Sequence, residues 1–524
     1  EPDDRRGDVR YHLVPYHPRR KLGTFMSGGT SLPIVERLAP TPDPLRVCEQ
    51  LTGLPYRLLL DSAGGGPRLA RFSFLMADPV AVIRSKGIHT EICDQTTGHV
   101  RLWNGDALTA VRALLVPHTV HSVPGVLPFQ GGAAGYLAYD WGQTLERLPA
   151  PRCDDLQLWD AVLGIYDWVV AWDHERSCAF LISTGMLEKS GQDRSEKART
   201  RLECVKARLR DSRTDSLASV NTRPAAWAAA KGFADVPSYR VDDGWFGGCS
   251  PPRSTFTHDG YLDVVSRVRE YIVAGDIFQA NLSQRFESAL SAPPWALYLQ
   301  LRQRSPAPFA AFMDLPDAAI VSASPERFLR VDGAGHVETR PVKGTRPRAV
   351  DPVDDEALGV ALLESAKDRA EHLMIVDLLR NDLSRVCSPG TVRVSELLSL
   401  ERHPTVQHLV STIVGTLEGG LDVVDLLRAT FPGGSITGAP KIRAMEIIAQ
   451  LEPSARAVYC GSIGYWSVTG ELDMNIAIRT AVAVNGRVYF GAGGGIVADS
   501  DPQQEYVETL DKARAFIEAL ASLA

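Results

Sequence analysis

Short apolar runs separated by turn residues recur along the first half of the chain, and they limit the fold to one rich in β-sheet. Residues 55–64, 71–87, 131–140 and 161–184 contain such runs. Each run is short for a helix, and glycine, aspartate or proline, which favour turns, follow it. The first half is therefore predicted to be sheet with few helices.

The second half mixes helical and strand patterns. Residues 261–274, 362–386, 441–451 and 503–523 are predicted helices, and 318–332, 457–468 and 476–498 are predicted strands. Between the halves, residues 188–248 begin as a charged helix and continue as an irregular connection. We therefore expect a tail or linker over residues 1–35, an N-terminal subdomain over 36–250 and a catalytic domain over 251–524.

The composition excludes several classes of function. The chain has 524 residues, with 56 Lys or Arg and 63 Asp or Glu, so its formal net charge is −7. A weakly acidic chain offers no general electrostatic surface to nucleic acid or anionic lipid, and no apolar run reaches the about 18 residues of a membrane span. Eight cysteines without a Cys-x-x-Cys pair indicate free thiols. We expect a cytoplasmic protein without nucleic-acid or membrane partners.

Two predicted helices carry carboxylates at helical spacing. Glu505, Glu508 and Lys512 share one face of the last helix, and Asp368 pairs with Glu371 at i, i+3 in another. If the two helices face each other, four carboxylates converge. Such a cluster favours a hard cation, and oxygen ligands suit Mg²⁺. The alternative is that both are solvated helix faces.

Two glycine-rich segments are candidate anion sites. FPGGSITGAPK (431–441) leads into a helix predicted to start near Pro440, where exposed N–H groups favour an anion. It lacks the Gly-Lys-Ser/Thr ending of a nucleotide-binding loop. GAGGGIVAD (491–499) is predicted to be a second such loop or a tight strand-to-helix turn. Arg479 and Tyr465 lie in apolar strand patterns, where an inward-pointing polar group pairs either structurally or with a substrate carboxylate.

Six ordered motifs resemble those of the chorismate-utilising enzyme family. They are SPERF (324–328), PVKGT (341–345), AEHLMIVDLLRND (370–382), FPGGSITGAPK (431–441), GSIGY (461–465), and GAGGGIVADS with EYVET (491–500 and 505–509). The match runs from about Phe256 to the C-terminus and extends more weakly into the first half through PYRLLLDS and PFQGGAAGYLAYD. The resemblance implies an α+β fold, similar to that of anthranilate synthases, in which two antiparallel sheets stack as a sandwich flanked by helices.

Two positions separate the chemistries within this family. Salicylate and isochorismate synthases resemble each other in having a lysine base where this chain has Gln279, so activation of water at ring C2 is not expected. Anthranilate synthases typically have alanine where this chain has Lys343 in PVKGT. Lys343 and Asn281 resemble instead the branch that aminates chorismate at C4, giving 4-amino-4-deoxychorismate for p-aminobenzoate and folate or for a secondary metabolite.

A lysine at this position can act as a nucleophile, because an amine in a desolvated pocket has a lowered pKa and a free lone pair. The resemblance implies that Lys343 adds to ring C2 as the C4 hydroxyl departs, and that ammonia then adds at C4 and expels the lysine. Glu326 is the implied general acid, with His408 and Thr345 near the same hydroxyl. Taken singly, each residue has a structural alternative. Glu326 could form an ion pair at a strand edge, His408 could be a hydrogen-bonded core histidine, and Lys343 could be a lysine in a turn.

The same resemblance implies the ligands of the metal and of the substrate. Mg²⁺ would be bound directly by Glu371 and Glu508, and through water by Asp368 and Glu505. The implied contacts to the substrate come from the following residues: Tyr465, Arg479, Gly493, Gly495, Lys512, Thr437 and Gln279.

The family also implies a partner. Ammonia is supplied to such enzymes by a glutamine amidotransferase, and the sequence has no Gly-x-Cys-x-Gly nucleophile turn of a glutaminase. The partner is therefore expected to be a separate subunit or an upstream fused domain. Two alternatives stay open: an anthranilate synthase component I, and a non-catalytic scaffold for the glutaminase. The family's tryptophan-binding region maps near residues 58–62, where LLLDSA departs from the Leu-Leu-Glu-Ser element, so feedback inhibition by tryptophan is not expected.

Overall fold

The computed structural model describes residues 33–523 except 65, 67–68, 121, 123–124, 189–190, 211–235, 242–250 and 403–405. Its described strands form two sheets, and every pair of neighbouring strands is antiparallel. The strands of sheet A are, in spatial order, β1 (Ile34–Leu38), β10 (Cys178–Ser183), β9 (Trp168–Asp173), β3 (Phe72–Met76), β2 (Arg57–Asp61), β14 (Phe309–Asp314), β15 (Ala319–Ser324), β24 (Thr480–Val484), β25 (Arg487–Ile496), β13 (Gln279–Ala289), β12 (Arg253–Ser254) and β11 (Tyr239–Arg240), with β21 (Gly438–Ala439) beside β13.

The strands of sheet B are, in the same manner, β18 (Val342–Pro347), β20 (Val406–Thr416), β17 (His336–Thr339), β16 (Arg327–Val331), β23 (Leu472–Asn475), β22 (Ser462–Ser467), β7 (Gly132–Leu137), β8 (Ala161–Tyr166), β4 (Ala81–Lys86), β5 (His89–Asp94) and β6 (Val100–Trp103), with β19 (Arg393–Arg402) beside β20. The α-helices of the described residues are α1 (Pro44–Gln50), α2 (Ala107–Leu115), α3 (Gly191–Arg210), α4 (His258–Val273), α5 (Pro294–Arg304), α6 (Pro352–Glu364), α7 (Ala366–Ser384), α8 (Val423–Thr430), α9 (Lys441–Leu451) and α10 (Pro502–Ala521). None of these helices is both long and apolar enough to cross a membrane.

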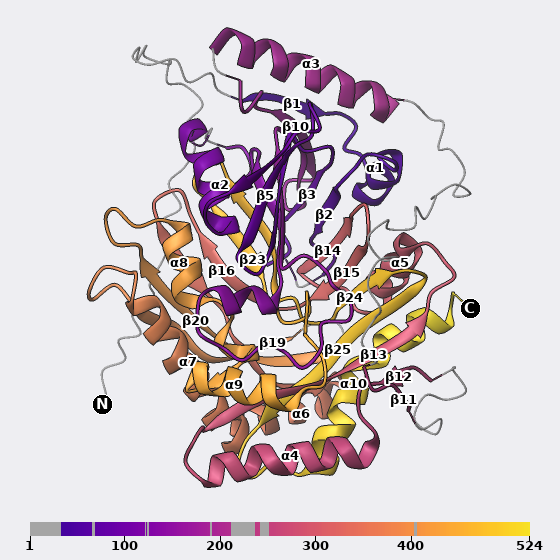
Figure 1. Cartoon of the computed structure of the whole chain (residues 1–524), viewed down its shortest axis with the longest axis vertical. Coiled ribbons are helices and arrows are strands. Elements are labelled where there is room, and N and C mark those ends of the chain that lie inside the picture. Colours follow the sequence, from indigo (N-terminus) through magenta and orange to yellow (C-terminus); the bar gives the residue numbers. More distant parts are fainter. Residues whose placement is uncertain are drawn as a thin grey trace, which may run out of the picture.

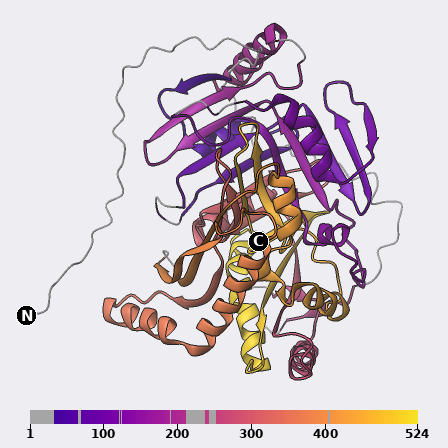
Figure 2. The same ribbon diagram turned by 90° about the vertical axis from the view of Figure 1, so that its left-hand side faces the viewer.

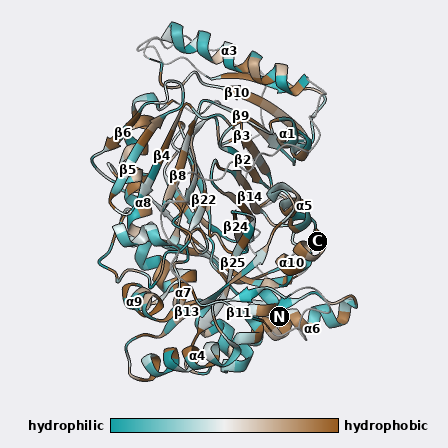
Figure 3. Ribbon diagram, turned by 45° about the vertical axis from the view of Figure 1, so that its right-hand side comes forward, coloured by the Kyte–Doolittle hydropathy of each residue, from teal (hydrophilic) through white to brown (hydrophobic). Residues whose placement is uncertain are grey.

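The two sheets pack face to face, and helices cover their outer faces. One core cluster joins β2, β3 and β14 of sheet A to β4, β7 and β22 of sheet B. A second cluster lies between sheet A and helices such as α4, α5 and α10, and a third lies between sheet B and helices α2, α7 and α8. Hydrophobic residues follow the strands, whereas the outer helix α3 is largely hydrophilic (Figure 3). The predicted α+β sandwich is therefore confirmed.

Both sheets contain strands from before and after residue 250. In sheet A, β2 pairs with β14, and in sheet B, β7 pairs with β22. Strands of the first half gather at the end of the molecule near α3, and the last helices lie at the other end (Figures 1 and 2). The segments 36–250 and 251–524 thus share both sheets. Ile34 and Val35, at the end of the predicted tail, belong to β1, and residues 1–32 lie outside the described residues.

Three local predictions differ from the structure. The helix predicted over 362–386 is divided, because the side chain of Ser365 accepts a hydrogen bond from the Asp368 N–H and caps the start of α7. The second glycine-rich segment is not a loop, because Gly491–Ile496 is the end of β25. Arg479 is not in a strand but directly precedes β24, with a φ of 50°. The predicted start of the helix near Pro440 is confirmed by α9.

Candidate active site

Lys343 extends from a bulge in β18. The pairing of β18 with β20 shifts by one residue between Val342 and Thr345, so that Lys343 and Gly344 together face Leu409. A bulge of this kind redirects side chains out of the regular alternation of a strand. Gly344 has a φ of 82°, which favours glycine at this position.

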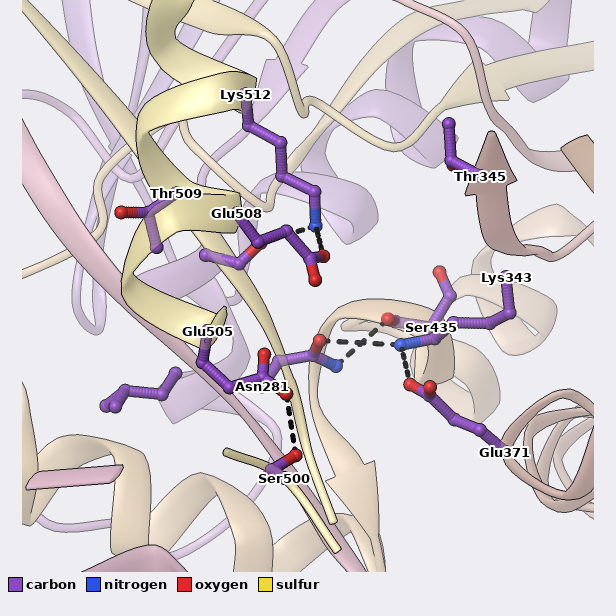
Figure 4. A network of polar contacts seen from close by, with 12 residues as sticks. Asn281, Lys343, Thr345, Glu371, Ser435, Ser500, Glu505, Glu508, Thr509 and Lys512 are labelled. Carbon is purple, nitrogen blue, oxygen red and sulfur yellow. Dashed lines mark hydrogen bonds and ion pairs between the residues drawn. The ribbon is translucent and has the colours of Figure 1, made fainter. Parts of the chain in front are cut away.

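The amine of Lys343 lies among polar groups from three other segments (Figure 4). Its Nζ atom is 2.8 Å from Oε1 of Glu371 on α7 and 3.5 Å from Oδ1 of Asn281 on β13. The orientation of the Asn281 amide is fixed, because its Nδ2 donates to the Ser435 carbonyl at 2.9 Å. The Lys343 and Glu371 side chains are only 11% and 12% exposed.

Glu326 lies in the turn between β15 and β16 and is 4% exposed. Burial raises the pKa of its carboxyl to about 7, against the opposing effects of a hydrogen bond with Ser435 and the charge of Lys343. A carboxyl with this pKa can carry a proton near neutral pH and release it. The arrangement therefore suits a general acid.

His408 and Thr345 face each other on adjacent strands. They are paired residues of β20 and β18, and His408 Nδ1 lies 3.0 Å from Thr345 Oγ1. Thr345 is two residues from Lys343 on β18, and the charge of Lys343 acts on Glu326. The structure thus places the residues proposed for proton transfer close to the proposed nucleophile.

Two consecutive glycines of β25 lie against the predicted metal ligands. A Cβ atom on Gly494 would lie 3.1 Å from an oxygen of Glu505 and 3.3 Å from one of Glu508. A Cβ atom on Gly495 would lie 2.3 Å from Oε1 of Glu371. Carboxylates from α7 and α10 therefore approach one short stretch of backbone.

These carboxylates have cationic neighbours. Glu508 accepts from Lys512 at 2.5 Å, an interaction that lowers the pKa of Glu508. Burial raises the pKa of Glu505, which also accepts a hydrogen bond from Ser500 at 2.7 Å. Asp368 is paired with a different cation, Arg346, at 2.9 Å.

The donor chemistry fits Mg²⁺, because every candidate ligand offers carboxylate oxygens. Within the described residues, however, no three His, Cys, Asp or Glu side chains lie close enough together to hold an ion. The ammonium groups of Lys343 and Lys512 form ion pairs with Glu371 and Glu508. A divalent cation at this position would have to displace them.

Arg479 is partly buried, and its guanidinium has no counter-ion among the described residues. Burial lowers the pKa of its guanidinium, and its ionisable neighbours are Tyr459 and Glu508. No described side chain forms an ion pair or hydrogen bond with it. A buried guanidinium is normally paired, so this one is suited to a carboxylate that arrives with a ligand.

Tyr459 is a site residue that sequence reasoning missed. Its ring lies against Gly491 of β25, where a Cβ atom would come within 2.4 Å of it, and it interacts with Arg479. Tyr459 lies six residues before Tyr465 in the same apolar segment. One sequence feature could have identified Tyr459 as a candidate: it lies just before Gly461 and β22, and loops at the ends of strands often carry functional side chains.

Tyr465 does not join the other predicted residues. Its ring packs against Phe74 and Phe129, with ring centroids 5.3 and 4.8 Å away. It lines a separate cavity of about 500 Å³ between the two sheets, together with residues 60–62. The segment LLLDSA, which the sequence analysis assigned to the family's tryptophan-binding region, therefore borders this cavity.

The remaining predicted substrate contacts lie near Lys343 and the carboxylates. Gln279 donates to Oε1 of Glu371 at 2.8 Å, and its own Oε1 is buried without a partner among the described residues. The Thr437 carbonyl accepts from the Asn281 N–H at 2.8 Å. Lys512 donates to the Gly493 carbonyl at 2.8 Å.

Comparisons with known proteins show the family to which the chain belongs. The model of a chorismate binding enzyme family matches residues 71–518. Aminodeoxychorismate synthase component 1 of Escherichia coli (strain K12) is 40% identical over 90% of this chain and 94% of its own length. Anthranilate synthase component 1 of Pseudomonas aeruginosa is 38% identical over 93% and 94%. The crystal structure of anthranilate synthase component I from Streptococcus pneumoniae TIGR4 has a TM-score of 0.70 at 32% identity and covers 85% of this chain and 92% of its own.

The chain therefore belongs to the family of chorismate-binding enzymes. Several of its relatives at about 40% identity are named aminodeoxychorismate synthase component 1, including that of Salmonella typhimurium at 41% identity over 89% of this chain and 93% of the relative.

Proposed function

We propose that this chain is the component 1 type of aminodeoxychorismate synthase and that it aminates chorismate at C4 to give 4-amino-4-deoxychorismate. The observation that carries the proposal is Lys343, whose amine lies beside Glu371 and Asn281 in a largely buried site. The names of the relatives at about 40% identity support the same reaction.

In the proposed mechanism, the Nζ atom of Lys343 attacks ring C2, and the ring double bonds shift as the C4 hydroxyl leaves. Glu326 donates a proton to this hydroxyl, which departs as water. Ammonia then adds at C4 and the lysine is expelled from C2, which regenerates the free amine. Nitrogen is placed at C4, and the enolpyruvyl group is retained. The hydrogen-bonded pair His408 and Thr345 would orient the departing hydroxyl.

The residues around the substrate support binding of a dianion. We assign the pyruvyl carboxylate to Arg479, because its partly buried guanidinium has no counter-ion in the part of the chain that the structure describes. Tyr459 beside it would donate a hydrogen bond to the same group. Glu371 and Glu508 would hold Mg²⁺ directly, with Asp368 and Glu505 acting through water. When bound, Mg²⁺ neutralises the ring carboxylate and makes the ring a better electron acceptor.

A component 1 enzyme implies a second component, and we propose a glutamine amidotransferase that supplies the ammonia. We also propose that the reaction takes place in the cytoplasm. Free cysteines support this, because a reducing compartment keeps buried thiols such as Cys48 and Cys460 unpaired.

The proposal is tested by incubating the chain with chorismate, Mg²⁺ and an ammonium salt, without glutamine, and by identifying the product by mass and fluorescence. We expect an amino compound that retains the enolpyruvyl group and that a lyase converts to p-aminobenzoate. Reactions without ammonium or without Mg²⁺ are the controls. Fluorescent anthranilate with free pyruvate would assign the chain to C2 amination, and the absence of any product would favour a glutaminase scaffold.

A further inference from the structure

Two consecutive residues of α7 contact Lys343. Glu371 pairs with its side chain at 2.8 Å, and the ring of the next residue, His372, interacts with its backbone. Neighbouring residues of a helix point in directions about 100° apart. Glu371 therefore reaches into the site, whereas His372, which is fully buried, reaches into the core.

One side of the His372 ring is held by β20. Its Nε2 atom lies 2.7 Å from Oγ of Ser411, which in turn accepts a hydrogen bond from the Leu398 N–H at 3.0 Å. The Ser411 N–H donates to the Pro341 carbonyl at 3.3 Å, two residues before Lys343. Ser411 thus joins the ring to the start of the strand that carries the nucleophile.

The hydroxyl proton of Ser411 has His372 Nε2 as its neighbouring acceptor, because Leu398 already donates to this oxygen. With the Ser411 proton directed at it, Nε2 carries no proton of its own. A neutral ring that accepts at Nε2 carries its proton on Nδ1. Nδ1 is buried and completes no hydrogen bond with the described residues, although the Lys343 backbone lies beside the ring.

A buried donor without a partner calls for an explanation. The Lys343–Gly344 bulge leaves the regular pairing with β20, so its backbone lacks the support that a continuous strand would have. We propose that His372 is a positioning residue for the nucleophile: anchored by Ser411, it directs Nδ1–H at the backbone of Lys343 and fixes the bulge from which the amine reaches the substrate. This inference depends on the proposed role of Lys343.

Two substitutions of similar size separate the ring nitrogens. The amide of His372→Asn can replace Nδ1, whereas that of His372→Gln can replace Nε2. We expect His372→Gln to lower kcat for C4 amination with ammonia at least tenfold, with the KM for chorismate within threefold of the wild type. His372→Asn keeps a donor at the Nδ1 position but loses the contact with Ser411, so its kcat should lie between that of His372→Gln and that of the wild type.

Ser411→Ala provides a second test that does not alter the histidine. Because it releases the anchored side of the ring, we expect a loss of kcat with little change in KM. Thermal unfolding of each variant reports on folding separately. Equal kcat values for the Gln and Asn variants, or a loss confined to KM, would overturn the inference. Failure of the proposed function is distinct, because the wild-type chain would then yield no C4-aminated product.

Discussion

The Nζ atom of Lys343 and the Glu371 oxygen that it contacts are 2.8 Å apart, and Gln279 donates to this same oxygen, also at 2.8 Å. The carboxylate that we propose as a magnesium ligand therefore also holds the proposed nucleophile. In the proposed function, binding of the cation and release of the amine would both involve this one oxygen atom.

Lys343→Ala should abolish C4 amination, because alanine cannot form a bond to ring C2. We expect kcat to fall by roughly three orders of magnitude, a loss typical of removing a group that acts in the chemical step. Steady-state rates with ammonia, with the product identified by mass, measure the effect. Lys206→Ala is the matched control, because Lys206 lies on α3, far along the chain from the site, and pairs with Glu36 and Glu203. Undiminished turnover by Lys343→Ala would contradict the assignment.

The activity should fall as the pH rises above about 7. The pKa of Glu326 is raised to about 7, so the proton that it must donate is present below this pH and is lost above it. We expect kcat to decrease about tenfold per pH unit on the alkaline side. The measurement is a pH profile of kcat at saturating chorismate and Mg²⁺. Glu326→Gln should be nearly inactive, and any residual rate should lack this limb; an unchanged limb in the variant would show that another group titrates.

Arg456 and Arg479 should respond differently to substitution by methionine. Arg456 is paired with Glu452 at 2.6 Å, so Arg456→Met leaves a buried carboxylate unpaired and should cost about 3–5 kcal/mol of unfolding free energy. Arg479 has no such partner among the residues that the structure describes, so Arg479→Met should change the unfolding free energy of the apo protein by less than about 1 kcal/mol or increase it. Urea unfolding of both variants gives the comparison.

Arg479→Met should also weaken chorismate binding. A hydrogen bond to a charged group contributes about 1.5–3 kcal/mol, which corresponds to a roughly 10- to 150-fold rise in KM. A normal KM in this variant would remove Arg479 from the substrate site.

Gly495→Ala should disrupt the proposed metal site without unfolding the chain. The added Cβ would lie 2.1 Å from Nε2 of Gln279 and 2.3 Å from Oε1 of Glu371, so both side chains must move. We expect the Mg²⁺ concentration for half-maximal activity to rise at least about tenfold. Gly419→Ala is the control, since nothing lies within 4 Å of its added Cβ. Equal Mg²⁺ dependence in the two variants would argue against a cation at Glu371.

The sequence predicted those parts of the site that depend on local periodicity. Glu505, Glu508 and Lys512 share a face of α10 because residues three and four apart are neighbours on any helix. The extended conformation of the glycine segment before α10 could not be predicted locally. It results from close pairing with β13, in which a Cβ atom on Gly493 would lie 2.2 Å from the Leu282 carbonyl.

The choice between two tyrosines was also beyond local pattern. Tyr459 and Tyr465 share one apolar segment, but Tyr459 precedes β22 and Tyr465 lies within it. The turn at Cys460, where φ is 64°, and the position of β22 in its sheet decide which of the two tyrosines lies beside Arg479. The alternation of apolar residues predicts neither this turn nor this sheet position, because it specifies only which residues share a face of a strand.

The sharing of both sheets by the two halves of the chain has a consequence for its synthesis. β2 and β7 are interior strands of the finished protein, but their neighbours β14 and β22 are translated much later, at residues 309–314 and 462–467. While the ribosome makes the intervening residues, each emerging strand has an unpaired edge and an apolar face. Exposed edges of this kind invite pairing with other chains. Nascent chains of this enzyme must therefore be protected from aggregation until almost the whole sequence has been translated.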